Sequence, residues 1–416
     1  VNVTGTVLNT SHTLTLDGTT GSWTVNGGTI SGGSLDFAGG QTLLFTANRN
    51  NLLTGVTVNG DLTLNTSLAV TKIAGGTTFT QAHLAASDAT LGYAPAQTLG
   101  GTVLFEGAGS GTRYLEMTGA GAFTIGPTGV IRTNTGLAAD ASIGGSNYFG
   151  GAMTLTNQGL ISSQVSGRTI TIEAASFTNS GTLEAANGGL ITVTNGYSQT
   201  AGTTLLSGNS EISVSSPKTI DIVAGSLEGS GTIASTVTNA GTIAPGDSGP
   251  GKLSITSDLA LAPTSAIQLE IGGLVQGTEY DLLSEAGTTP LTLEGTLSLT
   301  LIDGFMPNFA DTYTVVTSNQ ALAGAFANVV NGARVSTADG SSFQVNYGAG
   351  SSFGADNVVL SNFVAPEPTS ASLLAGGVLA LLGRRRRTAN GSLARPLFSP
   401  GLSVASIRTS SRLLGR

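Results

Sequence analysis

The chain has 416 residues, 61 of them Gly and none Cys; charged residues make up 10 % and hydrophobic residues 39 %. This composition excludes a charge-rich disordered chain, and the lack of Cys excludes disulfides, thiolate metal sites and thiol nucleophiles. The formal net charge is −8, but all 24 acidic residues precede Gly383 and half of the 16 basic residues follow it. The body is therefore strongly acidic, which argues against nucleic acid as its partner.

Residues 1–245 are expected to form a degenerate β-solenoid. Thr and the β-branched aliphatic residues favour strands, and apolar and polar residues alternate with period two, as in a half-buried strand. This alternation is clear in segments 13–16, 62–64, 170–172 and 191–194. The predicted core is made of inward Leu, Ile and Val, with Thr and Ser outside.

Short segments with Asn and Gly interrupt these strands, as in Asn157-Gln158-Gly159, Asn179-Ser180-Gly181 and Asn239-Ala240-Gly241. Because Asn and Gly favour turns, each segment is expected to form one corner of a coil. The step from Asn157 to Asn179 is about 20 residues, which is short for a repeat array. A β-sandwich uses the same alternation and remains the alternative fold.

Two later regions depart from this pattern. Residues 92–150 are less regular and are predicted to include an excursion from the coil. A turn-rich break at 244–251 is followed by longer amphipathic strands. Residues 252–362 are therefore expected to form the end of the solenoid and a C-terminal β cap, which would cover exposed strand edges.

Candidate chemistry in the body is weak. Gly246-Asp247-Ser248-Gly249-Pro250 is similar to the sequence around a serine-protease nucleophile, but His12 and His83 are the only histidines and lie far upstream. Gly32-Gly33-Ser34-Leu35-Asp36 only partly matches a calcium-binding nonapeptide and does not repeat. We interpret both as structural turns, and we expect no cofactor and no metal.

A carbohydrate-active enzyme on the same fold would need clustered carboxylates. The acidic residues are spaced singly along the chain, so no credible pair can be named from the sequence. Outward Thr-x-Thr rows are interpreted as solvent-facing strand positions rather than as an ice-binding or glycan-binding surface. A glycan-binding module would be favoured by exposed aromatic residues, but only Trp23 and seven Tyr are available.

Residues 365–387 contain three parts in a fixed order: a Pro-Glu-Pro motif, an uncharged run and four arginines. Proline keeps the first part extended and outside any helix or sheet. An uncharged helix of about 15 residues spans ~22 Å, short of the ~30 Å bilayer core, and snorkelling arginines with local thinning can cover the difference. The arginines would then face the cytoplasm, with the body outside. The alternative is a buried or interfacial helix with a basic end.

This trio resembles the PEP-CTERM sorting signal of Gram-negative bacteria. The resemblance implies that Pro366, Glu367 and Pro368 form the motif recognised by an exosortase, a membrane protease-transpeptidase. The implied transmembrane anchor is Ser370, Ala371, Ser372, Leu373, Leu374, Ala375, Gly376, Gly377, Val378, Leu379, Ala380, Leu381 and Leu382. The implied positive stop is Arg384, Arg385, Arg386 and Arg387.

Two features depart from that family. Members usually end a few residues after the arginines, whereas here a basic tail, 388–416, follows and is expected to be disordered. No export signal precedes Val1, so we expect that an N-terminal segment is missing.

The region before the signal is also similar to the ends of autotransporter-like β-helix proteins, at 241–246, 249–253 and 277–281. Segment 53–62 is similar to their repeats. These resemblances concern the fold more than an activity.

The sequence thus predicts an all-β parallel β-helix with a C-terminal cap and a short transmembrane helix. We expect a non-enzymatic structural or adhesive protein. It would be held transiently in the inner membrane, processed by an exosortase, and delivered to the cell surface or matrix, with exopolysaccharide as a candidate partner. The alternatives are a secreted carbohydrate-active enzyme and a glycan-binding protein on the same fold.

Overall fold

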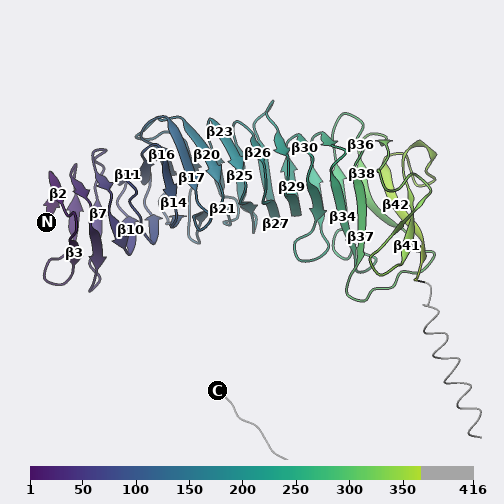
Figure 1. The fold of residues 1–416 in the computed structure, drawn as a ribbon, viewed down its shortest axis with the longest axis horizontal. Helices are drawn as coiled ribbons and strands as arrows, with labels where there is room; N and C mark the ends of the chain where they lie inside the picture. Colours follow the sequence, from purple (N-terminus) through teal and green to yellow (C-terminus); the bar gives the residue numbers. More distant parts are fainter. Residues whose placement is uncertain (367–416) are drawn as a thin grey trace, which may run out of the picture. The chain divides into compact units, whose positions relative to one another are not determined.

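The computed structural model describes residues 1–366, which form one compact unit. Apart from one 3-10 turn, Gly348–Gly350, the elements of this unit are strands. Figure 1 shows these strands stacked side by side along the long axis of the unit, from the N-terminal strands to β42. Most strands have three to six residues and are joined by short turns, as the Gly-rich and Asn-rich composition predicts.

The strands form three ladders of parallel strands, and a typical coil contributes one strand to each ladder. The first ladder comprises β2 (Thr6–Leu8), β5 (Thr29–Ser31), β8 (Leu52–Thr54), β11 (Val70–Ala74), β13 (Thr90–Tyr93), β16 (Arg113–Met117), β19 (Ala141–Ile143), β22 (Thr169–Ile172), β25 (Leu190–Val193), the second halves of β27 (Thr203–Val214) and β29 (Ser226–Ala234), β32 (Lys252–Ile255), β35 (Leu282–Glu285) and β38 (Tyr313–Ser318).

The second ladder begins as a separate three-stranded sheet and continues to the C-terminal coils. It comprises β1 (Asn2–Val3), β4 (Trp23–Val25), β7 (Leu43–Phe45), β10 (Asp61–Leu64), β12 (Gln81–Leu84), β15 (Thr102–Phe105), β18 (Val130–Thr133), β21 (Leu160–Ser163), β24 (Thr182–Ala185), the first halves of β27 and β29, β31 (Thr242–Pro245), β34 (Ala266–Ile271) and β37 (Thr296–Leu301).

The third ladder is made of three parallel sheets in succession. It comprises β3 (Thr13–Leu16), β6 (Ser34–Phe37), β9 (Thr57–Asn59), then β14 (Gln97–Leu99), β17 (Gly121–Ile125), β20 (Met153–Asn157), β23 (Ser176–Asn179), β26 (Tyr197–Gln199), β28 (Ile220–Ile222), β30 (Val237–Asn239), β33 (Leu259–Leu261), and finally β36 (Thr292–Leu293) with β39 (Ala323–Gly324).

These long, stacked parallel sheets confirm the predicted all-β architecture and are consistent with a β-helix. A β-sandwich does not fit them, because sandwiches are built from antiparallel sheets. Coil length varies: Ser226 pairs with Thr242, an offset of 16 residues, whereas Val130 pairs with Leu160, an offset of 30. This variation explains why the repeat is irregular in the sequence.

Apolar side chains in register form the core. Along the second ladder each inward residue pairs with the inward residue of the next coil, so that burial extends through the stack. This row is Leu62, Ala82, Val103, Ile131, Ile161, Leu183, Thr204, Leu227, Ile243, Ile267 and Leu297. Thr204 is the polar exception, and its hydroxyl hydrogen bonds with Gln199 and Tyr197 at 2.7 and 2.8 Å.

The Asn residues predicted at the corners belong to a row of polar side chains inside the stack of coils. Asn157 donates from Nδ2 to Oδ1 of Asn179 at 2.8 Å, and Asn179 donates to Oε1 of Gln199 at 3.2 Å. All three side chains are fully buried. A buried amide without partners is costly, so this row requires Asn or Gln in successive coils.

The Gly that follows each of these amide residues has a different role. A Cβ on Gly181 would lie 2.2 Å from the carbonyl oxygen of Gly159, and one on Gly202 would lie 2.0 Å from that of Gly181. The glycines therefore let the backbones of neighbouring coils approach closely at this corner.

The irregular stretch 92–150 stays largely within the ladders, because β13, β16 and β19 pair in register. The predicted excursion is thus smaller than expected and is confined to two loops, 106–112 and 144–151. Arg113, which follows the first loop and begins β16, is fully buried, and its guanidinium donates to backbone carbonyls. The acceptors are Glu106 at 2.9 Å, Gly107 at 2.9 Å, Gly109 at 3.0 Å and Gly111.

The second loop folds back over the first ladder. The buried carboxylate of Glu116 accepts backbone N–H groups from Asn147, Tyr148 and Phe149, at 3.1 Å for Tyr148 and 2.7 Å for Phe149. Burial raises the pKa of Glu116, although these three N–H donors act in the opposite direction. A Cβ on Gly92 would lie 2.5 Å from the ring of Phe149, so Phe149 packs directly over that glycine.

At the C-terminal end the pairing changes to antiparallel. β42 (Asn357–Val364) pairs antiparallel with β38 and with β41 (Ser342–Asn346), which also pairs antiparallel with β40 (Arg334–Ser336). The first and second ladders continue without interruption through the turn-rich break near residue 245, as far as β38 and β37.

Candidate functional site

The start of the predicted sorting segment lies at the end of the described unit. β42 ends at Val364, and the next two residues, Ala365 and Pro366, are exposed. The rest of the motif, from Glu367, together with the predicted anchor 370–382 and the arginines 384–387, lies outside the described residues. Within residues 1–366 there is no helix long and apolar enough to cross a membrane.

The chain leaves the described unit at a corner that two long loops also form. β34 and β37 are parallel neighbours in register, so the loops that follow them, 272–281 and 302–312, leave from the same edge. A Cβ on Gly272 would lie 2.9 Å from the side chain of Ile302, which places the two loops in contact.

The direction of β42 brings the chain end to this same corner. β42 is antiparallel to β38, with Leu360 opposite Tyr313, the first residue of β38. Residues 361–364 therefore run past the start of β38, toward the end of loop 302–312. We call the two loops together with Val364 the exit corner.

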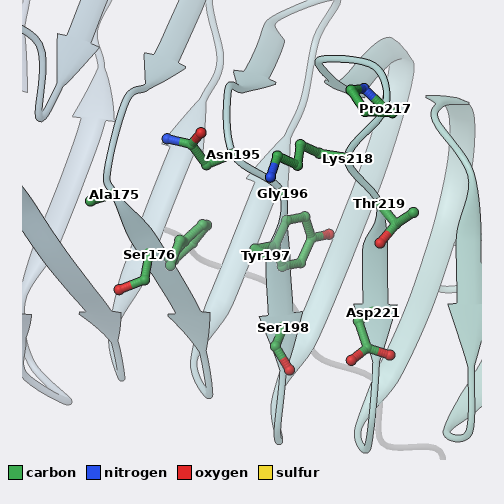
Figure 2. A pocket seen from close by; sticks show the side chains of 11 residues that line it. Ala175, Ser176, Asn195, Gly196, Tyr197, Ser198, Pro217, Lys218, Thr219 and Asp221 are labelled. Carbon is green, nitrogen blue, oxygen red and sulfur yellow. The ribbon is translucent and has the colours of Figure 1, made fainter.

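A second candidate is a hollow of about 370 Å³ beside the first residues of β23, β26 and β28, in the middle of the third ladder. Figure 2 shows the side chain of Lys218 extending toward Asn195 and Gly196, with the ring of Tyr197 below it and Asp221 on the next strand. A second hollow of about 350 Å³ lies on the other side of the loop that carries Lys218.

The chemistry that this hollow offers is limited. Asp221 is its single carboxylate, and Oδ1 of Asp221 accepts a hydrogen bond of 2.6 Å from Thr238. Its two aromatic rings, Phe177 and Tyr197, are each only 4 % exposed, so they offer little surface for stacking a sugar. The hollow can form polar contacts but lacks the paired carboxylates of a glycosidase.

A cluster that the sequence did not reveal lies on the outer face of the second ladder. Nδ1 of His83 lies 2.8 Å from Oε1 of Glu106, and Nε2 lies 3.6 Å from Oδ2 of Asp61. Glu106 also accepts a 2.8 Å hydrogen bond from Asn134. These residues come from successive coils. In the sequence, the sign of this cluster was a spacing of about one coil length between His83 and each acidic residue.

This cluster is a poor catalytic candidate, because Nδ1 of His83 is engaged by Glu106 and neither of the hollows described above includes His83. It instead links successive coils through the contact of His83 with Glu106 and the hydrogen bond from Asn134 to Glu106. Among residues 1–366, no group of three or more His, Asp or Glu side chains is arranged to hold a metal ion.

The protease-like segment is a turn. Ser248 has a positive φ of 62° and its hydroxyl donates to Asp247 at 3.2 Å. The two histidines lie elsewhere, His12 before β3 and His83 in β12, so the arrangement lacks the base that a serine nucleophile needs. Gly32 and Gly33 likewise form a positive-φ turn between β5 and β6.

Asp281 joins two of the segments with autotransporter-like sequence. It is 1 % exposed, and its carboxylate accepts the N–H of Gly251 and the N–H of Glu270, each at 2.7 Å. Burial raises the pKa of Asp281 to about 7, against the opposing effect of these two N–H donors.

The raised pKa of Asp281 predicts a pH dependence of stability. The unfolded chain releases this proton near pH ~4, whereas the folded protein retains it up to about pH 7. The free energy of unfolding should therefore fall as pH rises from about 4 to about 7 and change little above that. Urea unfolding at several pH values should show a flatter profile for Asp281→Asn, while Asp303→Asn, at an exposed position, keeps the wild-type slope. An unchanged slope in Asp281→Asn would contradict this assignment.

No protein-family model matches this chain, and no curated protein shows significant sequence similarity to it.

Proposed function

We propose that this chain is an exported structural or adhesive protein of the cell surface or extracellular matrix, sorted through its C-terminal segment by an exosortase-type membrane protease. The observation that carries the proposal is the order of three elements after the β body. Pro366-Glu367-Pro368 comes first, the uncharged run 370–382 second and the arginines 384–387 third. An apolar run with a basic end is the arrangement that orients a segment in a bilayer with its arginines inward.

The described part of the chain supports this proposal in two ways. The body ends at β42, and the motif begins two residues later at an exposed position, where a membrane enzyme could reach it. The stacked sheets give a long surface with outward Thr and Ser and few charges, a design suited to a structural role. The finer assignments, namely the C-terminal β cap and the transmembrane helix, form part of this proposal.

The alternative is a secreted carbohydrate-active enzyme or a glycan-binding protein on the same fold. Retaining and inverting glycosidases need two carboxyl groups about 5–9.5 Å apart. Four hollows along residues 1–366, the two described above and two smaller ones, have only one carboxylate in their linings, that of Asp221. This observation favours the structural role over the enzyme.

The sorting role predicts that Glu367→Ala blocks processing. The full chain, expressed behind an export signal in a Gram-negative host that has an exosortase, should be cleaved and released from the inner membrane. Glu367→Ala should leave full-length protein in the membrane fraction, because the recognition motif loses its carboxylate. Fractionation and intact mass measure both outcomes.

The matched control for this experiment is Asp247→Ala, which removes an exposed carboxylate from a turn in the body. It should be processed like the wild type. Normal cleavage and release of Glu367→Ala would refute the sorting role.

A further inference from the structure

The exit corner displays an unusual number of exposed apolar side chains. Among the described residues, eleven large hydrophobic side chains are exposed, and five of them lie at this corner. They are Leu274 (58 % exposed), Val275 (54 %), Met306 (56 %), Phe309 (67 %) and Val364 (44 %). The first four lie in the two adjacent loops, and we call them the apolar tips.

Hydrogen bonds hold the first loop, with its two apolar tips, in a defined conformation. Oε2 of Glu279 accepts the backbone N–H groups of Leu274 and Val275 at 2.8 and 3.0 Å. The N–H of Gly272 bonds to the carbonyl of Glu279 at 2.7 Å, and Gln276 donates to the carbonyl of Thr314 at 2.8 Å. This network orders the backbone, while both apolar side chains remain in solvent.

The second loop is ordered in a similar way. Oδ2 of Asp311 accepts the backbone N–H of Asn308 at 2.7 Å, and the N–H of Asp311 bonds back to the carbonyl of Asn308 at 3.1 Å. Phe309 lies within this tight turn and is two-thirds exposed. A fixed, exposed apolar cluster is costly in water, and this cost points to a partner surface that covers it.

We propose that the apolar tips of the exit corner insert into a phospholipid surface and hold the β body against the membrane during the anchored stage. This inference rests on the proposed function, because it uses the anchor at residues 370–382. Only residues 365–369 lie between β42 and that anchor. An extended chain advances at most ~3.6 Å per residue, so the six steps from Val364 to Ser370 keep Val364 within about 22 Å of the anchor. The anchor therefore gives the membrane a high effective concentration at the apolar tips.

Charge determines the kind of lipid surface. The loops 272–281 and 302–312 contain no Lys or Arg but include Glu279, Asp281, Asp303 and Asp311. The loops themselves thus offer no attraction to anionic headgroups, and their contact must come from burial of apolar side chains by ~5–10 Å into the headgroup boundary. Insertion should occur on zwitterionic phosphatidylcholine and should be insensitive to salt.

The absence of Cys from the chain allows a direct test. Phe309→Cys and Val275→Cys, each labelled with an environment-sensitive fluorophore, are reconstituted as full chains into phosphatidylcholine vesicles. The control is Val223→Cys, at a 50 % exposed position before β29, far from the exit corner. Flotation reports whether the chain is anchored, and quenching by brominated lipid reports whether each labelled site touches the acyl region.

If the inference holds, vesicles float with all three variants, and brominated lipid lowers emission about twofold at positions 309 and 275 but not at 223. Flotation without quenching at 309 and 275 overturns the inference and leaves the anchor intact. Failure to float contradicts the anchor itself, and the proposed function with it. A blue-shifted probe that brominated lipid does not quench indicates a protein partner or a second copy at the tips, which also overturns insertion into lipid.

Discussion

Arg113→Met is expected to lower the free energy of unfolding by about 3–5 kcal/mol, because several carbonyl groups lose their donor at a cost of about 1–3 kcal/mol each. The guanidinium is fully buried and donates to backbone carbonyls of the loop 106–112 that curls around it. Met fills a similar volume but donates no hydrogen bond, so these carbonyls would lose their partner inside the protein. Burial lowers the pKa of Arg113, while nearby Asp88 acts in the opposite direction.

The matched control is Arg49→Met, at an exposed position in the turn before β8. Its midpoint of urea unfolding should stay close to that of the wild type, because surface substitutions usually change stability by less than ~0.5 kcal/mol. Hydrogen exchange should show that Arg113→Met opens the loop 106–112 first. Equal midpoints for the two variants would show that the carbonyl cage around Arg113 contributes little.

The role of Arg113 illustrates what sequence reasoning could not find. Four of its acceptors lie two to seven residues away, in a loop without a regular pattern, and such a cage leaves no periodic signal. The same is true of Glu116, whose carboxylate binds a loop about thirty residues downstream. The length of each coil decides which residues meet across coils. Because coil length varies from 16 to 33 residues, a spacing of about one coil does not by itself select pairs such as His83 and Glu106.

Features that repeat in every coil could be predicted. Because apolar and polar residues alternate along each strand, every second side chain faces the core, whatever the length of the loops between strands. The recurring Asn-x-Gly segment was correctly interpreted as a corner. The structure adds that Asn179 hydrogen bonds inside the stack, while Gly181 allows the close approach of the neighbouring backbone.

The candidate site likewise has one part that could be predicted from the sequence and one part that could not. The motif that begins at Pro366 was evident in the sequence, because its residues are contiguous. The exit corner was not evident, because its loops and Val364 come together only through the parallel pairing of β34 with β37 and the antiparallel pairing of β42 with β38. Exposed apolar residues such as Phe309 are indistinguishable from core residues until the direction of each side chain is known.

Gly181→Ala is expected to be among the most disruptive single-methyl changes in the described unit. The new Cβ would lie 2.2 Å from the carbonyl oxygen of Gly159, which is backbone and cannot rotate away. To relieve this contact, the two coils must separate at the corner. Separation would stretch the hydrogen bond from the N–H of Thr182 to the carbonyl of Gly159, 2.8 Å long, and the buried bond between Asn157 and Asn179. We expect a loss of about 3 kcal/mol, the upper part of the range for overpacked sites.

Gly100→Ala is the matched control, because Gly100 occupies a corresponding corner between β14 and β15. Its added Cβ would lie 3.8 Å from the nearest atom, a hydroxyl of Thr128, and so would fit without strain. Loss of backbone freedom in the unfolded chain should make this variant as stable as the wild type or slightly more so. Comparing the urea unfolding of the two alanine variants therefore distinguishes two effects on stability. One is the steric clash between closely packed coils, and the other is the general effect of replacing Gly by Ala. If Gly181→Ala unfolded at the same urea concentration as Gly100→Ala, the coils could spread without cost, and close packing at the Asn-x-Gly corner would not be what fixes their spacing.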